Sequence, residues 1–239
     1  MRREALWQAA TLYEKSGSQA NAGRAYADYV KQFPAPLDPA QNARQRLADM
    51  AKAQNDSRVR SQWIAEIIAA DKSAGAARTE RSKYLAAKAT IETAEPQVAL
   101  FNSIKLNAPL DKSLKAKRGA MERALNIYGQ ALDYQVAEVT TAATYGMAEM
   151  YRQLAADLIS SERPKGLDAD AREQYDVLLE EQAFPFEEKS IELHETNAQR
   201  TGNGVYDEWV QHSFDVLAKL KPARYAKAEL GEEYVPSIR

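Results

Sequence analysis

The stretch that decides the fold is MRREALWQAATLYEKSGSQANAGRAYADYVKQFP, residues 1–34. Two small residues, Ala10 and Ala22, are spaced so that two helices can approach each other closely. Two bulky residues, Tyr13 and Tyr26, are expected to fill the space between those helices. The Ser-Gly-Ser triplet between the two halves predicts a turn, because glycine adopts backbone conformations that end helices. The stretch therefore predicts a helical hairpin.

The same stretch resembles the tetratricopeptide repeat, a 34-residue helix–turn–helix with the pattern W-x2-L-G-x2-Y, then A-x3-F, then P. With Tyr13 at the tyrosine position, Leu6 falls on the first large residue of the pattern and Pro34 on its proline. Tyr26 and Tyr29 then occupy the second-helix positions without a gap. The alternative is an ordinary helical hairpin with an alanine-rich seam.

A second, weaker copy of the repeat follows within residues 40–75. Its expected inner residues are Leu47, Ala48 and Ala51 on the first helix, and Ile64 and Ile67 on the second. The match is weaker because an arginine, residue 60, stands where the pattern expects a small residue. Residues 1–75 are therefore predicted to form two repeats of this kind.

Beyond residue 75 the pattern is less regular but stays helical, since alanine is abundant and glycine and proline are scarce. Helices are expected over residues 76–94, from Pro96 onward, over 111–133, 136–161, 168–184, 186–200 and 205–220. In the last of these, Val210, Phe214, Leu217 and Pro222 repeat the spacing of the first hairpin's second helix. The predicted fold class is all-α: a right-handed stack of antiparallel helix pairs, a TPR-like α-solenoid. Residues 76–239 are predicted to continue the stack as divergent helical repeats.

The composition excludes several classes of partner and site. The formal net charge of −2 gives no basis for binding nucleic acid, and the absence of cysteine excludes disulfides and thiolate metal sites. No apolar run approaches the roughly 20 residues that cross a bilayer. Helix-like sequence begins at once, so we expect a piece of a longer protein whose targeting signal lies upstream.

The C-terminal part is similar to the C-terminal region of bacterial envelope repeat proteins associated with TonB/Tol-like energy transduction or gliding-type motility. The similar strings are TTAATYGMAEMYRQLAADLISSERPKGL, YDVLLEEQAFPFEEKSIELHETNAQR and GVYDEWVQHSFDVLAKLKPARYAKAE, spanning residues 140–229. The resemblance implies a periplasmic, non-enzymatic, protein-binding role and supplies no catalytic residues. Possible partners are components of those envelope machineries.

The stretch EEQAFPFEEKSIELHETNAQR, residues 180–200, is the strongest candidate for a catalytic or metal site. It fails the His-Glu-x-x-His zinc pattern because no second histidine follows His194, and a Glu-x-x-His pattern fails because residue 191 is isoleucine. Glu188 and Glu195 are expected on a solvated helix face. Phe184 and Phe186 are expected to be buried on either side of Pro185, at a corner between two helices. No metal or cofactor is expected.

Two segments carry unbalanced charge. Residues 105–123 have six Lys/Arg and two acids, whereas residues 168–195 have two Lys/Arg and ten acids. They are interpreted as solvated helix faces, with a charged partner face or a mutual pairing as alternatives.

The residues predicted to contact a partner are Trp7, Thr11 and Glu14. Trp7 is expected to point away from the seam of its own hairpin, toward either a binding groove or an upstream repeat. Trp7 and Thr11 stand where chaperone-binding repeats carry a Lys/Asn clamp, so a chaperone adaptor is disfavoured.

The predicted function is a non-catalytic protein-protein interaction scaffold of the bacterial envelope. Two alternatives remain open: a cytoplasmic adaptor of the same fold, and a helical domain that encloses a small-molecule or lipid pocket between its long central helices.

Overall fold

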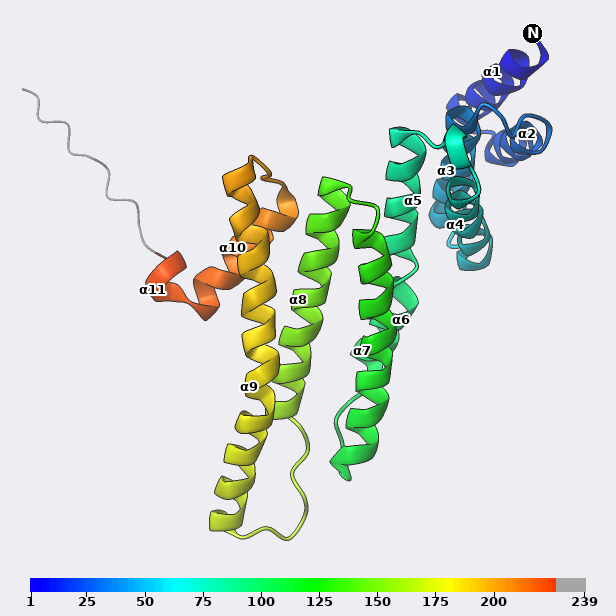
Figure 1. The fold of residues 1–239 in the computed structure, drawn as a ribbon. Helices are drawn as coiled ribbons and strands as arrows, with labels where there is room; N and C mark the ends of the chain where they lie inside the picture. The colour runs from blue at the N-terminus through cyan, green and yellow to red at the C-terminus, as the bar shows by residue number, and fades with distance from the viewer. Residues whose placement is uncertain (227–239) are drawn as a thin grey trace, which may run out of the picture.

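The computed structural model describes residues 1–226, and within them the chain is helical without any β-strand (Figure 1). The all-α class is therefore confirmed. The end of the predicted 76–239 region, and residues 227–229 of the C-terminal resemblance, lie outside the described residues. The α-helices are α1 (Arg2–Lys15), α2 (Gln19–Gln32), α3 (Leu37–Ala53), α4 (Ser57–Lys72), α5 (Glu80–Glu92), α6 (Glu95–Ser103), α7 (Leu110–Leu132), α8 (Ala137–Ile159), α9 (Ala169–Gln199), α10 (Glu208–Leu220) and α11 (Pro222–Tyr225).

The first hairpin, α1 and α2, packs through its small residues as predicted. Ala10 and Ala22 have no exposed surface, and Tyr26 is also buried in this core. The backbone between the helices turns at Gly17, which has a φ of +77°. Because glycine lacks a Cβ, it adopts this left-handed conformation without steric cost. Small residues therefore close the seam, and aromatic rings that include Tyr26 fill it.

Two expectations for α1 were wrong. Tyr13 is 42% exposed, not buried. Trp7, expected to point away from the seam, packs inside it, with its ring 5.5 Å from that of Tyr26 and 5.4 Å from that of Tyr29. The residues that α1 turns toward α2 are Trp7, Ala10 and Glu14, a stripe at helical spacing that does not include residue 13.

The second hairpin, α3 and α4, also forms where it was predicted. Its inner residues pack against each other and against α5, as a core that includes Ala48, Ile64 and Ile67. Arg60, the residue that weakened the repeat match, lies at the edge of this core. Its guanidinium pairs with Glu92, at the end of α5, and with Glu95, at the start of α6. The larger side chain therefore links this hairpin to the next helices.

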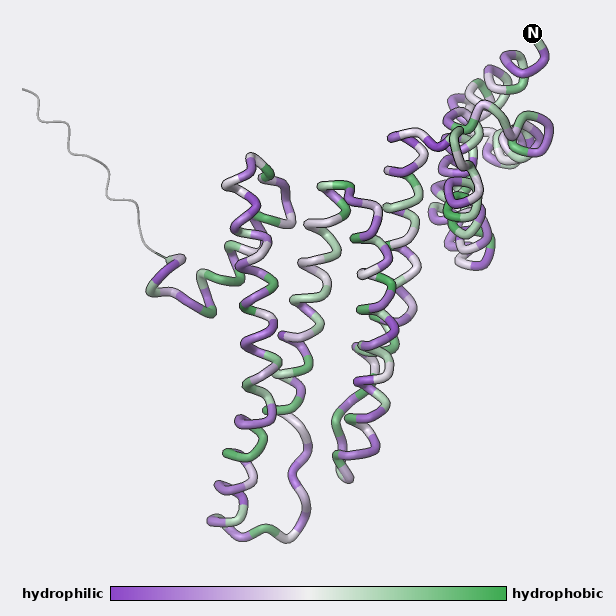
Figure 2. The backbone as a smooth tube through the Cα atoms, in the orientation of Figure 1, coloured by the Kyte–Doolittle hydropathy of each residue, from purple (hydrophilic) through white to green (hydrophobic). Residues whose placement is uncertain are grey.

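The helices α7, α8 and α9 lie side by side and are the longest in the described chain (Figure 1). Hydrophobic and hydrophilic residues alternate along them (Figure 2), as expected for helices with one buried side. A core of Met121, Ala124, Leu154 and Leu158 fills the space where α7 and α8 meet. A Cβ at Gly146 would lie 2.7 Å from Cζ of Tyr128, so a larger residue here would force the tyrosine ring on α7 to shift.

The predicted corner at Pro185 is wrong, because α9 runs unbroken through this proline for 31 residues. Phe184, expected to be buried, is 59% exposed, whereas Phe186 is partly buried against the core between α7 and α8. Proline removes one backbone hydrogen bond and crowds the preceding turn. Packing of α9 along α8 offsets that cost, through buried residues on both sides of the proline such as Leu179, Ala183 and His194.

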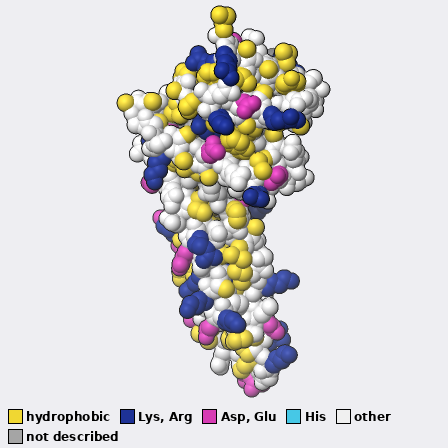
Figure 3. All heavy atoms as spheres, turned by 90° about the vertical axis from the view of Figure 1, so that its right-hand side faces the viewer, with side chains coloured by type: hydrophobic (Ala, Val, Ile, Leu, Met, Phe, Trp, Pro, Cys, Tyr) yellow, Lys and Arg dark blue, Asp and Glu magenta, His cyan; other side chains and the backbone are white. Residues whose placement is uncertain are grey.

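Within residues 1–226, no helix combines the length and the apolar character that a membrane span requires. On the face shown in Figure 3, Lys and Arg side chains are interspersed with Asp and Glu side chains. That face therefore carries no extended patch of a single charge.

Candidate functional site

The most polar part of the interior lies where α8, α9 and α10 meet. His194 of α9 has no exposed surface, and its Nε2 lies 3.4 Å from Oε1 of Glu149 on α8. Arg152, one turn further along α8, donates to both oxygens of the same carboxylate, at 2.9 Å and 2.7 Å. The result is a chain of three ionisable groups that runs from the protein surface into the core.

The charge of Glu149 is stabilised by these neighbours. Burial by itself raises the pKa of Glu149, but the nearby imidazole of His194 and the hydrogen bonds from Arg152 outweigh burial and bring the pKa down to about 2. The carboxylate is therefore ionised at any ordinary pH. A group so firmly ionised is a poor proton donor or acceptor near neutrality, and its role is to fix α9 against α8.

A second set of hydrogen bonds attaches α10 to the same junction. Asn197 on α9 donates to the carbonyl oxygen of Thr141 at 3.0 Å and to Oγ of Ser213 at 3.1 Å. Asp207 caps the start of α10 by accepting from the backbone N–H groups of Trp209 and Val210. These contacts hold α10 in position, and the two made by Asn197 lie in the buried interior.

Aromatic rings cover this polar junction. The ring of Tyr145 lies 5.5 Å from His194, 5.5 Å from Trp209 and 5.7 Å from His212. The rings pack against each other and bury His194 completely. Among residues 1–226 no group of three or more His, Asp or Glu side chains is placed to hold a metal ion. The junction is thus built to hold three helices together, with its one buried imidazole out of reach of a substrate.

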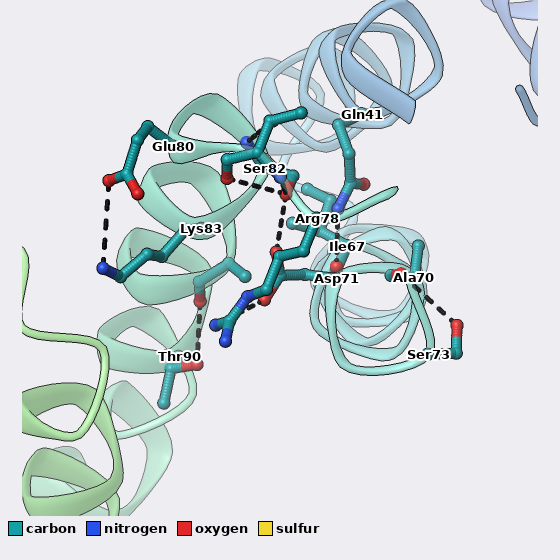
Figure 4. A network of polar contacts seen from close by, with 12 residues as sticks. Gln41, Ile67, Ala70, Asp71, Ser73, Arg78, Glu80, Ser82, Lys83 and Thr90 are labelled. Atoms are coloured by element: carbon teal, nitrogen blue, oxygen red, sulfur yellow. Dashed lines mark hydrogen bonds and ion pairs between the residues drawn. The ribbon is translucent and has the colours of Figure 1, made fainter. Parts of the chain in front are cut away.

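A second buried polar network joins α3, α4 and α5 (Figure 4). The side chain of Asp71 at the end of α4 is fully buried, accepts a hydrogen bond from Oγ of Ser82 at 2.7 Å and pairs with Arg78 at 2.8 Å. Gln41 of α3 is also fully buried and donates to the carbonyl oxygen of Ile67 at 2.9 Å. This network connects the second hairpin to α5.

A third buried charge, Lys117 of α7, binds the carbonyl groups at the C-terminal end of α6. Its Nζ donates to the carbonyl oxygens of Phe101 at 2.7 Å and Ile104 at 3.0 Å, and pairs with Asp157 at 2.6 Å. The last carbonyls of a helix lack partners within the helix, and a cation there is favourable. All three donor positions of this ammonium group are therefore used, so its role is structural.

The outward side of α9 is exposed to solvent and so is open to a partner. Asp170, Glu173, Val177, Leu178 and Glu181 line a surface hollow of about 620 Å³. Val177 is 49% exposed and Leu178 54% exposed. Together with Phe184, at the same helical spacing one turn further on, these residues are called the α9 face below. Apolar side chains exposed side by side are a common sign of a binding surface.

The α9 face was not among the predicted sites. Of the two adjacent leucines, Leu179 is buried and Leu178 is exposed. The acidic composition of residues 168–195 was a signal for this surface. The apolar residues gave no such signal, because adjacent leucines in a helix usually belong to the hydrophobic core.

The predicted partner-binding residues lie together on α1, on the side that faces α2. Oγ1 of Thr11 donates to the carbonyl oxygen of Trp7 at 2.9 Å, and Glu14 accepts from the hydroxyl of Tyr26 at 2.7 Å. Trp7 and Glu14 thus serve the hairpin itself, and Thr11 is half-buried beside them. Their contact with a partner stays a prediction.

The two carboxylates predicted to be exposed on α9 differ. Glu188 is exposed, as expected. Glu195 was predicted to be exposed too, but only 20% of its side chain is accessible, because Lys221, Arg224 and the hydroxyl of Tyr225 surround it. The turn after α10 brings these groups back onto α9, and nothing local in the sequence around Glu195 shows this.

The two charged segments do not neutralise each other. Among the described residues no ion pair joins 105–123 to 168–195. The segments meet through a shared apolar core that includes Met121 and Ala183, and the guanidinium of Arg118 lies 5.1 Å from the ring centre of Phe186. The pairing alternative is therefore not supported, and most of the acidic charge of α9 faces solvent.

Comparison of the chain with protein-family models, with curated proteins and with solved structures finds no match.

Proposed function

We propose that this chain is a non-catalytic scaffold that binds partner proteins on the surface of a TPR-like stack of helix pairs. The observation that carries the proposal is the α9 face, where Val177, Leu178 and Phe184 are exposed next to exposed acidic side chains. Water-exposed apolar side chains lower solubility unless a partner covers them, whereas other apolar residues of α9, such as Leu179 and Ala183, are buried.

Two further observations support a non-catalytic role. The buried ionisable groups His194, Asp71 and Lys117 lie in helix junctions, each held in place by neighbouring helices. The core where α7 and α8 meet is occupied by side chains, which does not favour the alternative of a lipid or small-molecule pocket between the central helices.

The proposed compartment is the bacterial periplasm. It rests on the resemblance of residues 140–229 to envelope repeat proteins, and a cytoplasmic adaptor of the same fold remains the alternative. The sequence of the whole gene separates the two, because a signal peptide upstream of these residues assigns the chain to the envelope.

The test of the proposed function is retention of proteins from an extract on immobilised chain. The variant Val177→Glu/Leu178→Glu disrupts the α9 face, and Leu12→Glu/Tyr206→Glu makes the same charge change at exposed residues elsewhere. We expect a protein that is retained by the parent and by the control but lost from the α9-face variant. Identical retention by all three would remove the α9 face as the binding surface.

A further inference from the structure

We propose that the segment bound by the α9 face is a basic amphipathic helix of a partner protein. This inference rests on the proposed function, since it identifies the partner element that the same surface takes. It follows from three properties of the face: its length and straight course, its apolar centre and its unbalanced charge.

The shape of the face fits a helix. Its residues recur at helical spacing from Asp170 to Phe184 on one side of α9. At 1.5 Å per residue this stripe is about 21 Å long, which corresponds to roughly four turns of a helix lying alongside. The pair Val177 and Leu178 lies near its middle, within the hollow. Helices that bind in such grooves present apolar anchors at i, i+3, i+4 and i+7.

The charge of the face selects a basic occupant. Three carboxylates of residues 168–195 form ion pairs with other described residues. Asp176 pairs with Arg163, and Glu192 pairs with Lys189. Glu195 pairs with Lys221 and Arg224. Asp170, Glu173 and Glu181 make none of these pairs and border the hollow. Lys or Arg on the flanks of a docked helix would lie next to these carboxylates, which favours association and sets orientation.

Other occupants fit less well. An anionic membrane surface would be repelled by the acidic residues that surround the apolar centre. A second copy of this chain could bind through the basic residues Lys115 and Arg118 on α7. The hollow beside them, however, is also lined by Asp111 and Glu122. A separate basic helix meets neither obstacle.

The experiment uses a synthetic amphipathic peptide of Leu and Lys, labelled with fluorescein, and a second peptide with the same composition but a scrambled order. Binding to the full chain is measured by fluorescence anisotropy at several salt concentrations. We expect the amphipathic peptide to bind at least about tenfold more tightly than the scrambled one, because only the former forms an apolar stripe.

The variant Val177→Glu/Leu178→Glu distinguishes docking of an apolar stripe from purely electrostatic binding. It adds negative charge, so purely electrostatic binding would become tighter. Docking of an apolar stripe would become at least about tenfold weaker. The control Leu12→Glu/Tyr206→Glu carries the same added charge and should bind like the parent. Circular dichroism confirms that each variant is folded.

Three results would overturn the inference: equal binding of both peptides, tighter binding by the α9-face variant, or a dimer of the parent that this variant abolishes. The last result would assign the face to a second copy. If the peptides fail but a protein from the extract is still lost from the α9-face variant, the proposed function stands and only the basic helix is wrong.

Discussion

Ala22 on α2 has no exposed surface, like Ala10 on α1, so a larger side chain at this residue has no free space to enter. Replacing Ala22 with leucine should overpack this seam and lower the free energy of unfolding by about 1–3 kcal/mol. The measurement is urea denaturation followed by circular dichroism. Ala20→Leu is the matched control, because Ala20 is exposed on the same helix. Equal stability of both variants would show that the hairpin does not pack through its alanines.

Glu149 makes the stability of the α8–α9 junction depend on pH. Its pKa is lowered from 4.5 to about 2 in the folded chain, so its contribution is fully present above about pH 4.5 and is lost as the pH falls toward 2. Glu149→Gln should therefore cost on the order of 2 kcal/mol at pH 7, and much less near pH 2.5.

The pH test compares unfolding of parent and variant at both values, so that other titrating groups cancel. The exposed Glu188→Gln on α9 serves as the control and should change stability little at either pH. A cost for Glu149→Gln that does not depend on pH would mean that its carboxylate is not held in the ionised form by His194 and Arg152.

At the level of helices, local signals in the sequence located most boundaries correctly. Asp168, where a helix was predicted to begin, caps α9 by accepting from the N–H of Ala171, and Asp56 caps α4 by accepting from the N–H of Val59. Such caps act over three residues, so a sequence displays them directly. Predictions failed where a distant helix decided the outcome: Glu195 is covered by the turn after α10, and the direction of Tyr13 depends on how α2 lies across α1.

Pro185 is the reason why α9 was predicted as two separate helices. A proline in a helix interior costs about 3 kcal/mol relative to alanine, which made a corner the natural prediction. The sequence around it contains no measure of how much surface α9 buries on α8. Only the packed structure shows that this burial holds the helix together on both sides of the proline.

Pro185→Ala should therefore stabilise the chain, by about 1–3 kcal/mol, since it restores the backbone hydrogen bond to residue 181 and removes the clash with that turn. Urea denaturation measures the change. Pro222→Ala is the control, because Pro222 stands in the first turn of α11, where proline is tolerated. A loss of stability in Pro185→Ala would indicate that the proline is needed for a bend.

Among the described helices, α1–α4 meet the rest mainly at α5, and the ion pair of Arg60 with Glu95 also reaches α6 (Figure 1). In such an array, stability is close to a sum of local units and of the interfaces between them. The α4–α5 interface contains the buried Asp71, whose two oxygens are taken up by Ser82 and Arg78. This one carboxylate is therefore expected to couple the first four helices to the remainder.

Asp71→Asn keeps the shape of the side chain but removes the charge that faces Arg78, at an expected cost of about 1–3 kcal/mol. Because the loss falls on an interface, amide hydrogen exchange should become faster in α1–α4 and stay nearly unchanged in α7–α9. Glu66→Gln is the control, since Glu66 pairs with Arg44 within the second hairpin and is half exposed. Faster exchange throughout the chain would instead show that all of its helices unfold as one cooperative unit, without a boundary at α5.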